Sequence, residues 1–290
     1  MKKLTYNENT GDLEIPLESL SEGLLYAKKK SIHNIKITKA QISLDYESAF
    51  ASLVGDDNIR SIYIADDVNL KKINLEPLYQ LKNLKKLVMQ YLKGRIDFSK
   101  ISTLEALYIT KADQEIDCLS IYGLEELLLV SIKNIDCKFI SLLSELKILR
   151  ISSARIDNLS GIEMLDKLEV IKLSHCPDLT DISSVNKLKE LSKLYVEKCK
   201  EINSFEFLNE NKTINELFLS TVNSLSFIPT MKCIKYLKFW ELKDGDLNYL
   251  LKSPSLEKVD FYPQKKHYTH KKEEINNLIV RSAKASAEGR

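Results

Sequence analysis

A nine-residue pattern of apolar residues recurs through most of this chain of 290 residues. It is clearest at residues 168–176, where apolar side chains occupy the first, fourth and sixth places. The pattern starts again at Ile32, Ile59, Leu84, Leu104, Leu124, Leu146, Leu168, Leu191, Ile214, Ile234 and Leu256. Successive starts are 27, 25, 20, 20, 22, 22, 23, 23, 20 and 22 residues apart. This self-similarity predicts a repeat architecture, in which each unit buries its apolar face against its neighbours.

The fourth to sixth places of each unit alternate between apolar and outward-facing residues. In Leu149-Arg150-Ile151, for example, the two aliphatic side chains point to one face of the chain and Arg150 points to the other. This period of two indicates a short strand with one buried face. Strands of successive units, about 4.8 Å apart, are then expected to form a parallel hydrogen-bonded ladder.

The spacing of the apolar residues, L-x-x-L-x-L with a period between 20 and 29 residues, resembles that of leucine-rich-repeat proteins. The segment 179–188 carries the pattern D-I-x-x-x-x-x-L. That pattern is similar to the 22-residue class of bacterial internalin-like proteins and of a eukaryotic phosphatase regulator. The resemblance implies an α/β fold: a right-handed leucine-rich-repeat solenoid of about eleven repeats, with parallel strands on the concave face.

The ends of the chain do not follow the repeat. We expect residues 1–31 to form an N-terminal cap that includes a hairpin of residues 4–6 and 13–15, and residues 32–262 to form the repeats. Residues 263–290 are expected to be a C-terminal cap helix and tail that cover the last strand. The repeats continue without a Pro-, Gly- or Ser-rich linker, which favours one continuous domain. The first two repeats are the long ones, and residues 46–53, in the first of them, are predicted to form a helix on the convex side.

Composition and charge favour a cytoplasmic protein. The chain has 43 Lys and Arg against 41 Asp and Glu, so a strong nonspecific attraction to nucleic acid or to an anionic membrane is not expected. It contains no signal-peptide pattern after Met1 and no apolar run long enough to span a membrane. Its five cysteines have no paired short spacing, which suits reduced thiols better than a disulfide framework.

Motifs for catalysis or cofactor binding are missing from the sequence. The eight glycines are placed singly and none begins a phosphate-binding loop. Cys176 and Cys199 occupy the ninth place of successive repeats and are predicted to be buried thiols; only His175 accompanies them, which is too few ligands for zinc. We therefore predict that the protein is not an enzyme and has no cofactor and no metal site.

The outward-facing strand positions carry an unusual number of aromatic residues. Because the core does not need these positions, exposed aromatics near Arg and Lys indicate a protein interface. The alternative is that Tyr and Phe occupy them only because they are good strand formers. The predicted partner-binding residues are Tyr63, Tyr108, Arg150, Lys172, Tyr195, Phe218, Tyr236, Lys238, Trp240 and Tyr262.

The sequence therefore predicts noncatalytic recognition of another protein through the concave face. One concrete form is a bacterial immunity or inhibitor protein that blocks a toxin or effector, since the chain is a single module without an output domain. A regulatory or targeting subunit of an enzyme such as a phosphatase is the alternative. A small-molecule substrate, a nucleic acid or a membrane as partner is disfavoured by the missing site and the nearly balanced charge.

Overall fold

The computed structural model describes the backbone of residues 4–40 and 45–288, and the side chains of these segments as far as Arg281. The chain forms two compact units. The N-terminal unit comprises Met1–Asn134 and Phe139–Leu146, and the C-terminal unit comprises Ile135–Lys138 and Lys147–Arg290. The division falls within the predicted repeats, at a place where the sequence has no linker.

The N-terminal unit contains a sheet that begins with the predicted hairpin. Its strands are β1 (Thr5–Asn7), β2 (Asp12–Pro16), β3 (Asn34–Thr38), β4 (Ser61–Ile64), β5 (Lys86–Met89), β6 (Ala106–Ile109) and β7 (Glu126–Val130). Its helices are η1 (Leu17–Ser19), α1 (Leu20–Lys29), η2 (Ala51–Leu53), η3 (Leu70–Lys72), α2 (Glu76–Tyr79) and η4 (Phe98–Lys100). Strand β1 is antiparallel to β2, with Tyr6 opposite Leu13, and β2–β7 follow as parallel neighbours.

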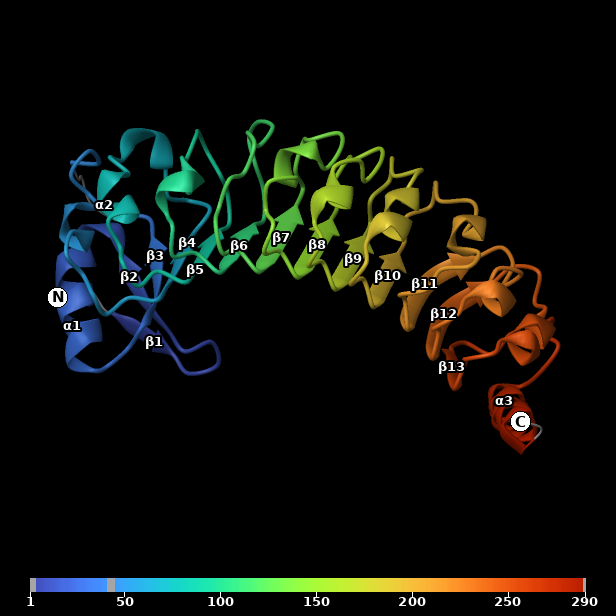
Figure 1. Ribbon diagram of the computed structural model, residues 1–290. Coiled ribbons are helices and arrows are strands. Elements are labelled where there is room, and N and C mark those ends of the chain that lie inside the picture. Colours follow the sequence, from blue (N-terminus) through green and yellow to red (C-terminus); the bar gives the residue numbers. More distant parts are fainter. Residues whose placement is uncertain (1–3, 41–44, 289–290) are drawn as a thin grey trace. The chain divides into compact units, whose positions relative to one another are not determined.

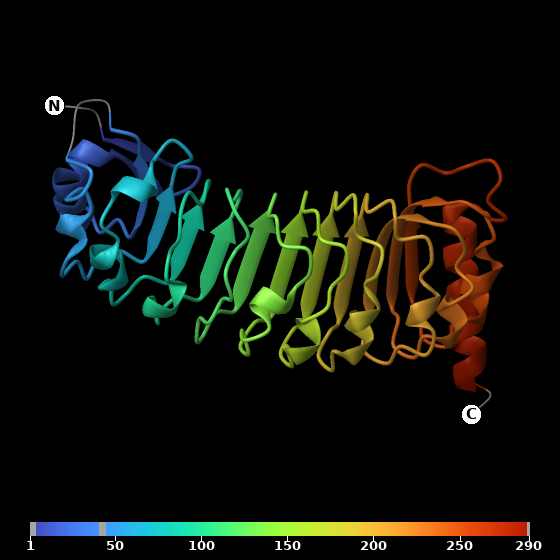
Figure 2. The ribbon, with the colours of Figure 1, turned by 90° about the horizontal axis from the view of Figure 1, so that it is seen from above.

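The C-terminal unit continues the same repeat. Its strands are β8 (Ile148–Ser152), β9 (Val170–Ser174), β10 (Lys193–Glu197), β11 (Glu216–Val222), β12 (Tyr236–Leu242) and β13 (Lys258–Phe261). Its helices are η6 (Ile162–Met164), η7 (Ser183–Lys187), η8 (Glu206–Leu208), η9 (Ile228–Thr230), η10 (Leu247–Lys252) and α3 (Lys272–Glu288), and η5 (Lys138–Ile140) spans a boundary between the units in the sequence. The strands of this unit are parallel and lie side by side in chain order (Figure 2).

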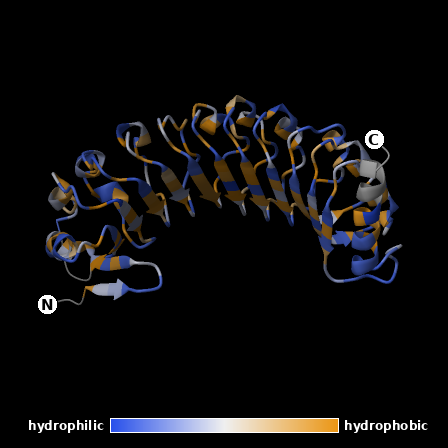
Figure 3. Ribbon diagram, turned by 60° about the horizontal axis from the view of Figure 1, so that its bottom comes forward, coloured by the Kyte–Doolittle hydropathy of each residue, from blue (hydrophilic) through white to orange (hydrophobic). Residues whose placement is uncertain are grey.

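The repeat pattern explains the strands of both units. Each of β3–β13 begins two residues after a predicted repeat start. In β9, Ile171 and Leu173 are completely buried whereas Lys172 is exposed, and Figure 3 shows this alternation of hydropathy along the strands. In each unit the strands lie on one side and the short helices on the other (Figure 1). The outward-facing side of each sheet is called here its strand face.

The helix predicted over residues 46–53 is not formed. Residues 47–50 form turns, followed by the single 3-10 turn η2, and Phe50 and Leu53 are buried. Two buried residues three positions apart need only one 3-10 turn, and an eight-residue helix gains few internal hydrogen bonds. The expectation of a regular helix in this repeat is therefore wrong.

Helix α3 covers the free edge of β13. Ile275 and Ile279 are buried, and the Asn276 side chain binds the strand edge at Val259. The Val259 N–H donates to Asn276 Oδ1 at 3.0 Å, and Asn276 Nδ2 donates to the Val259 carbonyl oxygen at 2.9 Å. One amide side chain thus replaces a neighbouring strand at this position. The helix runs to Glu288, into the segment predicted as a tail.

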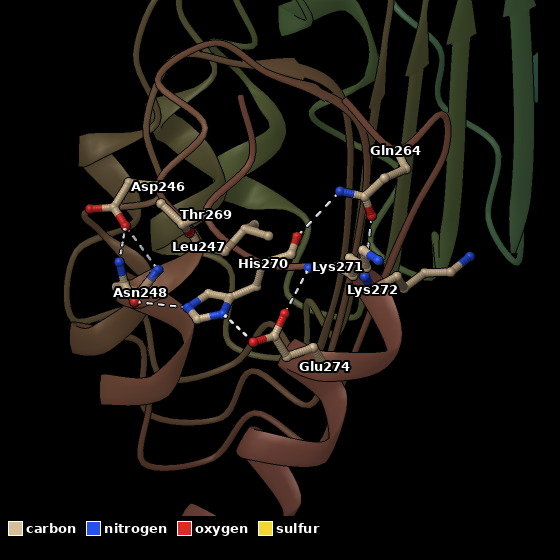
Figure 4. Close-up of polar contacts among 9 residues, drawn as sticks. All are labelled: Asp246, Leu247, Asn248, Gln264, Thr269, His270, Lys271, Lys272 and Glu274. Carbon is tan, nitrogen blue, oxygen red and sulfur yellow. Dashed lines mark hydrogen bonds and ion pairs between the residues drawn. The ribbon is translucent and has the colours of Figure 1, made fainter. Parts of the chain in front are cut away.

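Polar contacts also hold the start of α3 against η10 (Figure 4). His270 lies between the two helices, with Nε2 3.0 Å from Asn248 Oδ1 and Nδ1 3.4 Å from Glu274 Oε1. The Lys271 N–H donates to Glu274 Oε2, and Gln264 bonds the backbone of both His270 and Lys272. These bonds satisfy polar groups at the turn into the helix.

Candidate functional site

The strand face of the C-terminal unit holds a groove of about 480 Å³ across β10–β13. Four aromatic side chains line it: Tyr195, Phe218, Tyr236 and Trp240. The charged residues of the lining are Glu216, Lys238, Lys258 and Asp260. We call this the aromatic groove. Strand register explains the grouping, because Tyr195 of β10 is the partner of Phe218 in β11, which is the partner of Lys238 in β12.

Three of the aromatic rings form a continuous series across neighbouring strands. The ring centroids of Tyr195 and Phe218 are 6.5 Å apart, and those of Phe218 and Trp240 are 5.1 Å apart with an edge-to-face angle of 68°. All three side chains are partly exposed. Such pairs stabilise one another while presenting apolar surface to solvent.

Both carboxylates of the aromatic groove are paired with lysines. Lys193 lies 3.2 Å from Glu216, and Lys238 and Lys272 lie 3.8 Å and 3.1 Å from Asp260. The Tyr195 hydroxyl donates to Glu216. The groove is therefore apolar in its centre and nearly neutral at its margin.

These contacts change the acid–base behaviour of the groove residues. Burial, reinforced by the hydrogen bond to the Glu216 carboxylate, raises the pKa of Tyr195 well above its usual range. Burial also tends to raise the pKa of Glu216, but hydrogen bonds from Tyr195 and Lys193 outweigh it and leave that pKa below its ordinary value. Glu216 therefore stays ionised and Tyr195 stays protonated at neutral pH, which keeps the hydrogen bond between them in place.

Five of the ten predicted partner-binding residues line the aromatic groove: Tyr195, Phe218, Tyr236, Lys238 and Trp240. Lys172 adjoins it, with Nζ 4.9 Å from the centre of the Tyr195 ring. Arg150 and Tyr262 are in the same unit but are outside the lining, and Tyr262 is 77% exposed. No partner is present, so the assignment of these residues to binding stays a prediction.

Tyr63 and Tyr108 lie in the other unit, in a separate cavity of about 530 Å³ on the strand face of β3–β6. Arg60, Lys85 and Lys86 also line it. Each tyrosine ring has a lysine beside it: Lys36 Nζ lies 5.5 Å from the centre of the Tyr63 ring, and Lys86 Nζ lies 4.4 Å from that of Tyr108. Seven of the ten predicted residues therefore line one of two separate sites, five in the aromatic groove and two in this cavity.

The prediction did not include Glu216, Lys258 and Asp260 among the site residues. They occupy outward-facing strand positions next to the aromatic ones. In the sequence, these residues differ from other charged residues only in their cross-strand neighbours, which are aromatic or oppositely charged. Cross-strand partners of known register are needed to recognise such pairs.

The two repeat cysteines are buried, as predicted from their place in the repeat, and both are free thiols. Cys176 and Cys199 follow β9 and β10 and are close enough for a thiol–thiol hydrogen bond. Their sulfurs also contact carbonyl oxygens, at 3.5 Å for Cys176 with Ser174 and for Cys199 with Glu197. The contacts with the loop backbone fit a structural role.

Two searches concern chemistry beyond the aromatic groove. Across residues 4–40 and 45–288, we find no group of three His, Cys, Asp or Glu side chains placed to hold a metal ion. Within the same segments, no helix combines the length and apolar character needed to cross a bilayer.

No known protein-family profile matches the chain, and no curated protein matches it in sequence. Solved structures do resemble it. Internalin inlF of Listeria monocytogenes has a TM-score of 0.57 at 19% identity, covering 82% of this chain and 70% of the internalin. TLR13, in its complex with ssRNA13, has a TM-score of 0.54 at 18% identity, covering 86% of this chain and 42% of TLR13. Internalin inlC2 of the same bacterium has a TM-score of 0.44 at 19% identity, covering 59% and 76% of the two chains.

Identities this low show similarity of fold and not of function. Internalin inlF and TLR13 are leucine-rich-repeat proteins, and the chain spans less than half of TLR13. The similarity agrees with the strand register, the period and the buried ladders described above. The chain is therefore a leucine-rich-repeat solenoid, as its sequence predicts.

Proposed function

We propose that this protein binds another protein through the strand face of its C-terminal unit, with the aromatic groove as the anchoring site. The carrying observation is the run of Tyr195, Phe218 and Trp240, whose rings touch in series on positions the core does not require. Partly exposed aromatic clusters are the usual centre of protein interfaces, because they bury a large area at a small cost in conformational entropy.

A protein partner suits the charges of the aromatic groove better than a nucleic acid. Glu216 and Asp260 lie in its lining, and carboxylates repel a phosphate backbone. TLR13 has a similar fold and is seen with ssRNA13, but similarity of fold carries no ligand with it. An apolar side chain of a protein placed against Phe218 and Trp240 meets no such repulsion.

The most specific form of the proposal is a cytosolic immunity or inhibitor protein that occupies a toxin or effector directly. Binding in this form needs only the rigid strand face and no catalytic group. All five cysteines are free thiols, which fits a reducing compartment. A regulatory subunit of an enzyme would use the same surface, and the identity of the captured partner distinguishes the two.

The test is affinity capture from a lysate of the source organism with wild type and with Tyr195→Ala/Trp240→Ala, compared by quantitative mass spectrometry. We expect a partner that is retained by the wild type and lost with the variant. Tyr122→Ala/Tyr249→Ala is the matched control, because it also removes two aromatic rings, neither of which lines the aromatic groove. Circular dichroism and thermal unfolding establish that all three proteins are folded. Equal recovery with the two double variants would contradict the proposal.

A further inference from the structure

A second cavity lies in the C-terminal unit, where the chain leaves β10, β11 and β12. Its volume is about 240 Å³, and it is lined by three lysines, Lys198, Lys200 and Lys243, together with polar side chains that include Asn203 and Asn223. No carboxylate is among the described residues that line it. We call this the lysine cavity.

The positive charge of the lysine cavity is offset only in part, since Lys243 also interacts electrostatically with Glu241, which lies outside the lining. In the described segments of the chain, none of its three lysines forms an ion pair with a carboxylate. Glu241 lies on the neighbouring part of β12, but its carboxylate is 2.8 Å from Lys265 Nζ, which lowers its pKa. Three lysines border one small cavity whose lining holds no carboxylate among the described residues, so an anion bound there is attracted by their positive charge.

The backbone around the lysine cavity is held in place. Lys198 has a φ of 52°, and its N–H donates to the buried hydroxyl of Ser220 at 2.7 Å. Asn223 Nδ2 donates to the Asn203 carbonyl oxygen at 2.6 Å. The loops after β10 and β11 are thus tied to each other. The cavity is therefore largely formed before any ligand arrives, which reduces the entropic cost of binding.

Lys198 connects this cavity to the aromatic groove. Its Nζ lies 5.9 Å from the centre of the Trp240 ring, and Trp240 itself lines the aromatic groove. A partner segment that places an apolar side chain against Trp240 therefore brings its neighbouring residues to Lys198, at the edge of the lysine cavity.

From this placement we propose that the partner is recognised through a segment in which an apolar anchor is flanked, on one side, by acidic residues, and that the lysine cavity binds their carboxylates. The inference rests on the proposed function of the aromatic groove. A nucleic acid fits less well, because its phosphates continue past the lysines to Glu216 and Asp260. A protein segment confines its charge to one end and presents apolar groups to the other.

A phage-displayed library of random dodecapeptides, selected on the immobilised full-length protein, tests this inference. Peptides enriched on the wild type are expected to carry an aromatic or aliphatic residue with two or more Asp or Glu residues to one side of it. The same selection on Lys198→Gln/Lys200→Gln/Lys243→Gln is expected to retain the apolar residue and lose the acidic ones. The matched control is Lys187→Gln/Lys212→Gln/Lys232→Gln, which removes the same charge from residues that precede β10, β11 and β12.

Fluorescence anisotropy with a synthetic copy of an enriched peptide measures how much the lysines contribute to its affinity. The cavity variant is expected to bind it about tenfold more weakly than wild type, and the control variant within about twofold. Raising the salt to about 0.5 M NaCl should bring the wild type close to the cavity variant. A single-stranded oligouridylate of equal charge is the competing probe and is expected not to displace the peptide.

Four outcomes overturn the inference: no enriched peptides, enriched peptides without acidic residues, equal losses in the cavity and control variants, or preferential binding of the oligouridylate. Phe218→Ala/Trp240→Ala separates this failure from that of the proposed function. If that variant selects the same peptides as wild type, the aromatic groove is not the anchor. Alternatively, the variant enriches no peptides while the peptides enriched on the wild type lack acidic residues. In that case the assignment of the aromatic groove holds and that of the lysine cavity fails.

Discussion

The N-terminal and C-terminal units build different surfaces from the same repeat. On the N-terminal strand face, Tyr63 and Tyr108 each have a lysine ammonium group against the ring, and the cavity they line has three basic residues. On the C-terminal strand face, lysines also lie beside Tyr195 and Trp240, but the rings of Tyr195, Phe218 and Trp240 form a series across neighbouring strands. The carboxylates at its margin are paired with lysines. The buried ladders are alike and the outward residues differ, so the surface of each unit is determined by residues that folding does not require.

Strand length also differs between the units. Strands β11 and β12 have seven residues, whereas the strands of the N-terminal unit have three to five. In β11 the alternation of buried and outward residues changes phase after Leu219, so that Ser220 is buried as well. The extra length carries Trp240 beyond the four-residue ladder that pairs β12 with β13. Longer strands thus widen the surface where the aromatic groove and the lysine cavity meet.

The largest expected effect tests whether the two buried ladders are equivalent. Ile62→Asp in β4 and Ile171→Asp in β9 each place a carboxylate where the wild-type side chain is completely buried. Each change should cost at least about 4 kcal/mol and abolish the cooperative unfolding transition in urea. The exposed neighbour Lys172→Asp, as control, should change the free energy of unfolding by less than about 1 kcal/mol. A large loss in only one unit would show that the ladders are not equivalent.

The next effect concerns the outward residues. Once a partner is known, Tyr195→Ala/Trp240→Ala should weaken its binding by at least about 30-fold, because these rings form the proposed anchor. Tyr63→Ala/Tyr108→Ala should weaken it by less than about fivefold, because these two rings lie outside the aromatic groove, in the other unit. Surface plasmon resonance with each folded variant gives the two ratios. The reverse order would move the anchor to the N-terminal unit.

A smaller effect distinguishes two glycines with left-handed backbone. Gly161, in the C-terminal unit, has a φ of 110°, and a Cβ there would lie 2.6 Å from the Cys137 carbonyl carbon and oxygen. Gly123, in the N-terminal unit, has a φ of 90° and open space around it. Gly161→Ala should therefore cost about 3 kcal/mol and Gly123→Ala about 1 kcal/mol, measured by urea unfolding. Equal losses of unfolding free energy in the two variants would mean that the left-handed backbone alone, and not the close contact at Gly161, causes them.

The sequence was sufficient to predict the ladders. Its apolar residues recur with one period, and that pattern specifies which side of each strand is buried whatever lies between the strands. The segment 46–53 was predicted wrongly because a helix and a turn can both bury Phe50 and Leu53. Local pattern does not distinguish these conformations when only two residues need burial.

The candidate site was only partly predictable. Alternation identified the outward aromatics, but it did not show that Lys36 and Lys86 cover two of them, since that depends on side-chain orientation. The sequence does not predict the lysine cavity. Lys198, Lys200 and Lys243 lie in loops after their strands, and the repeat pattern does not specify the positions of these loops. Their proximity depends on how the loops stack, which is a property of the folded chain.

The smallest effect compares one ion pair from each unit. A hydrogen bond from Lys272 lowers the pKa of Asp260 in the aromatic groove, and one from Lys71 lowers the pKa of Asp113 in the N-terminal unit. A lowered carboxyl pKa stabilises the fold fully above the ordinary value of 3.8, and this contribution is lost as the pH falls through the folded-state pKa. Both pairs are partly exposed to solvent, so each should contribute less than about 1 kcal/mol at neutral pH.

Lys272→Met and Lys71→Met test this equivalence. Each should move the pKa of its partner carboxyl back toward 3.8, measured by NMR titration, and reduce stability at about pH 6 more than at about pH 2. Lys266→Met, which removes an exposed lysine beyond β13, should move neither pKa. Only Lys272→Met should also change the charge pairing in the aromatic groove, because Asp260 would then keep only its ion pair with Lys238, at 3.8 Å. A changed affinity for the partner in Lys272→Met but not in Lys71→Met would therefore locate the interface in the C-terminal unit even though the two ion pairs are equally weak.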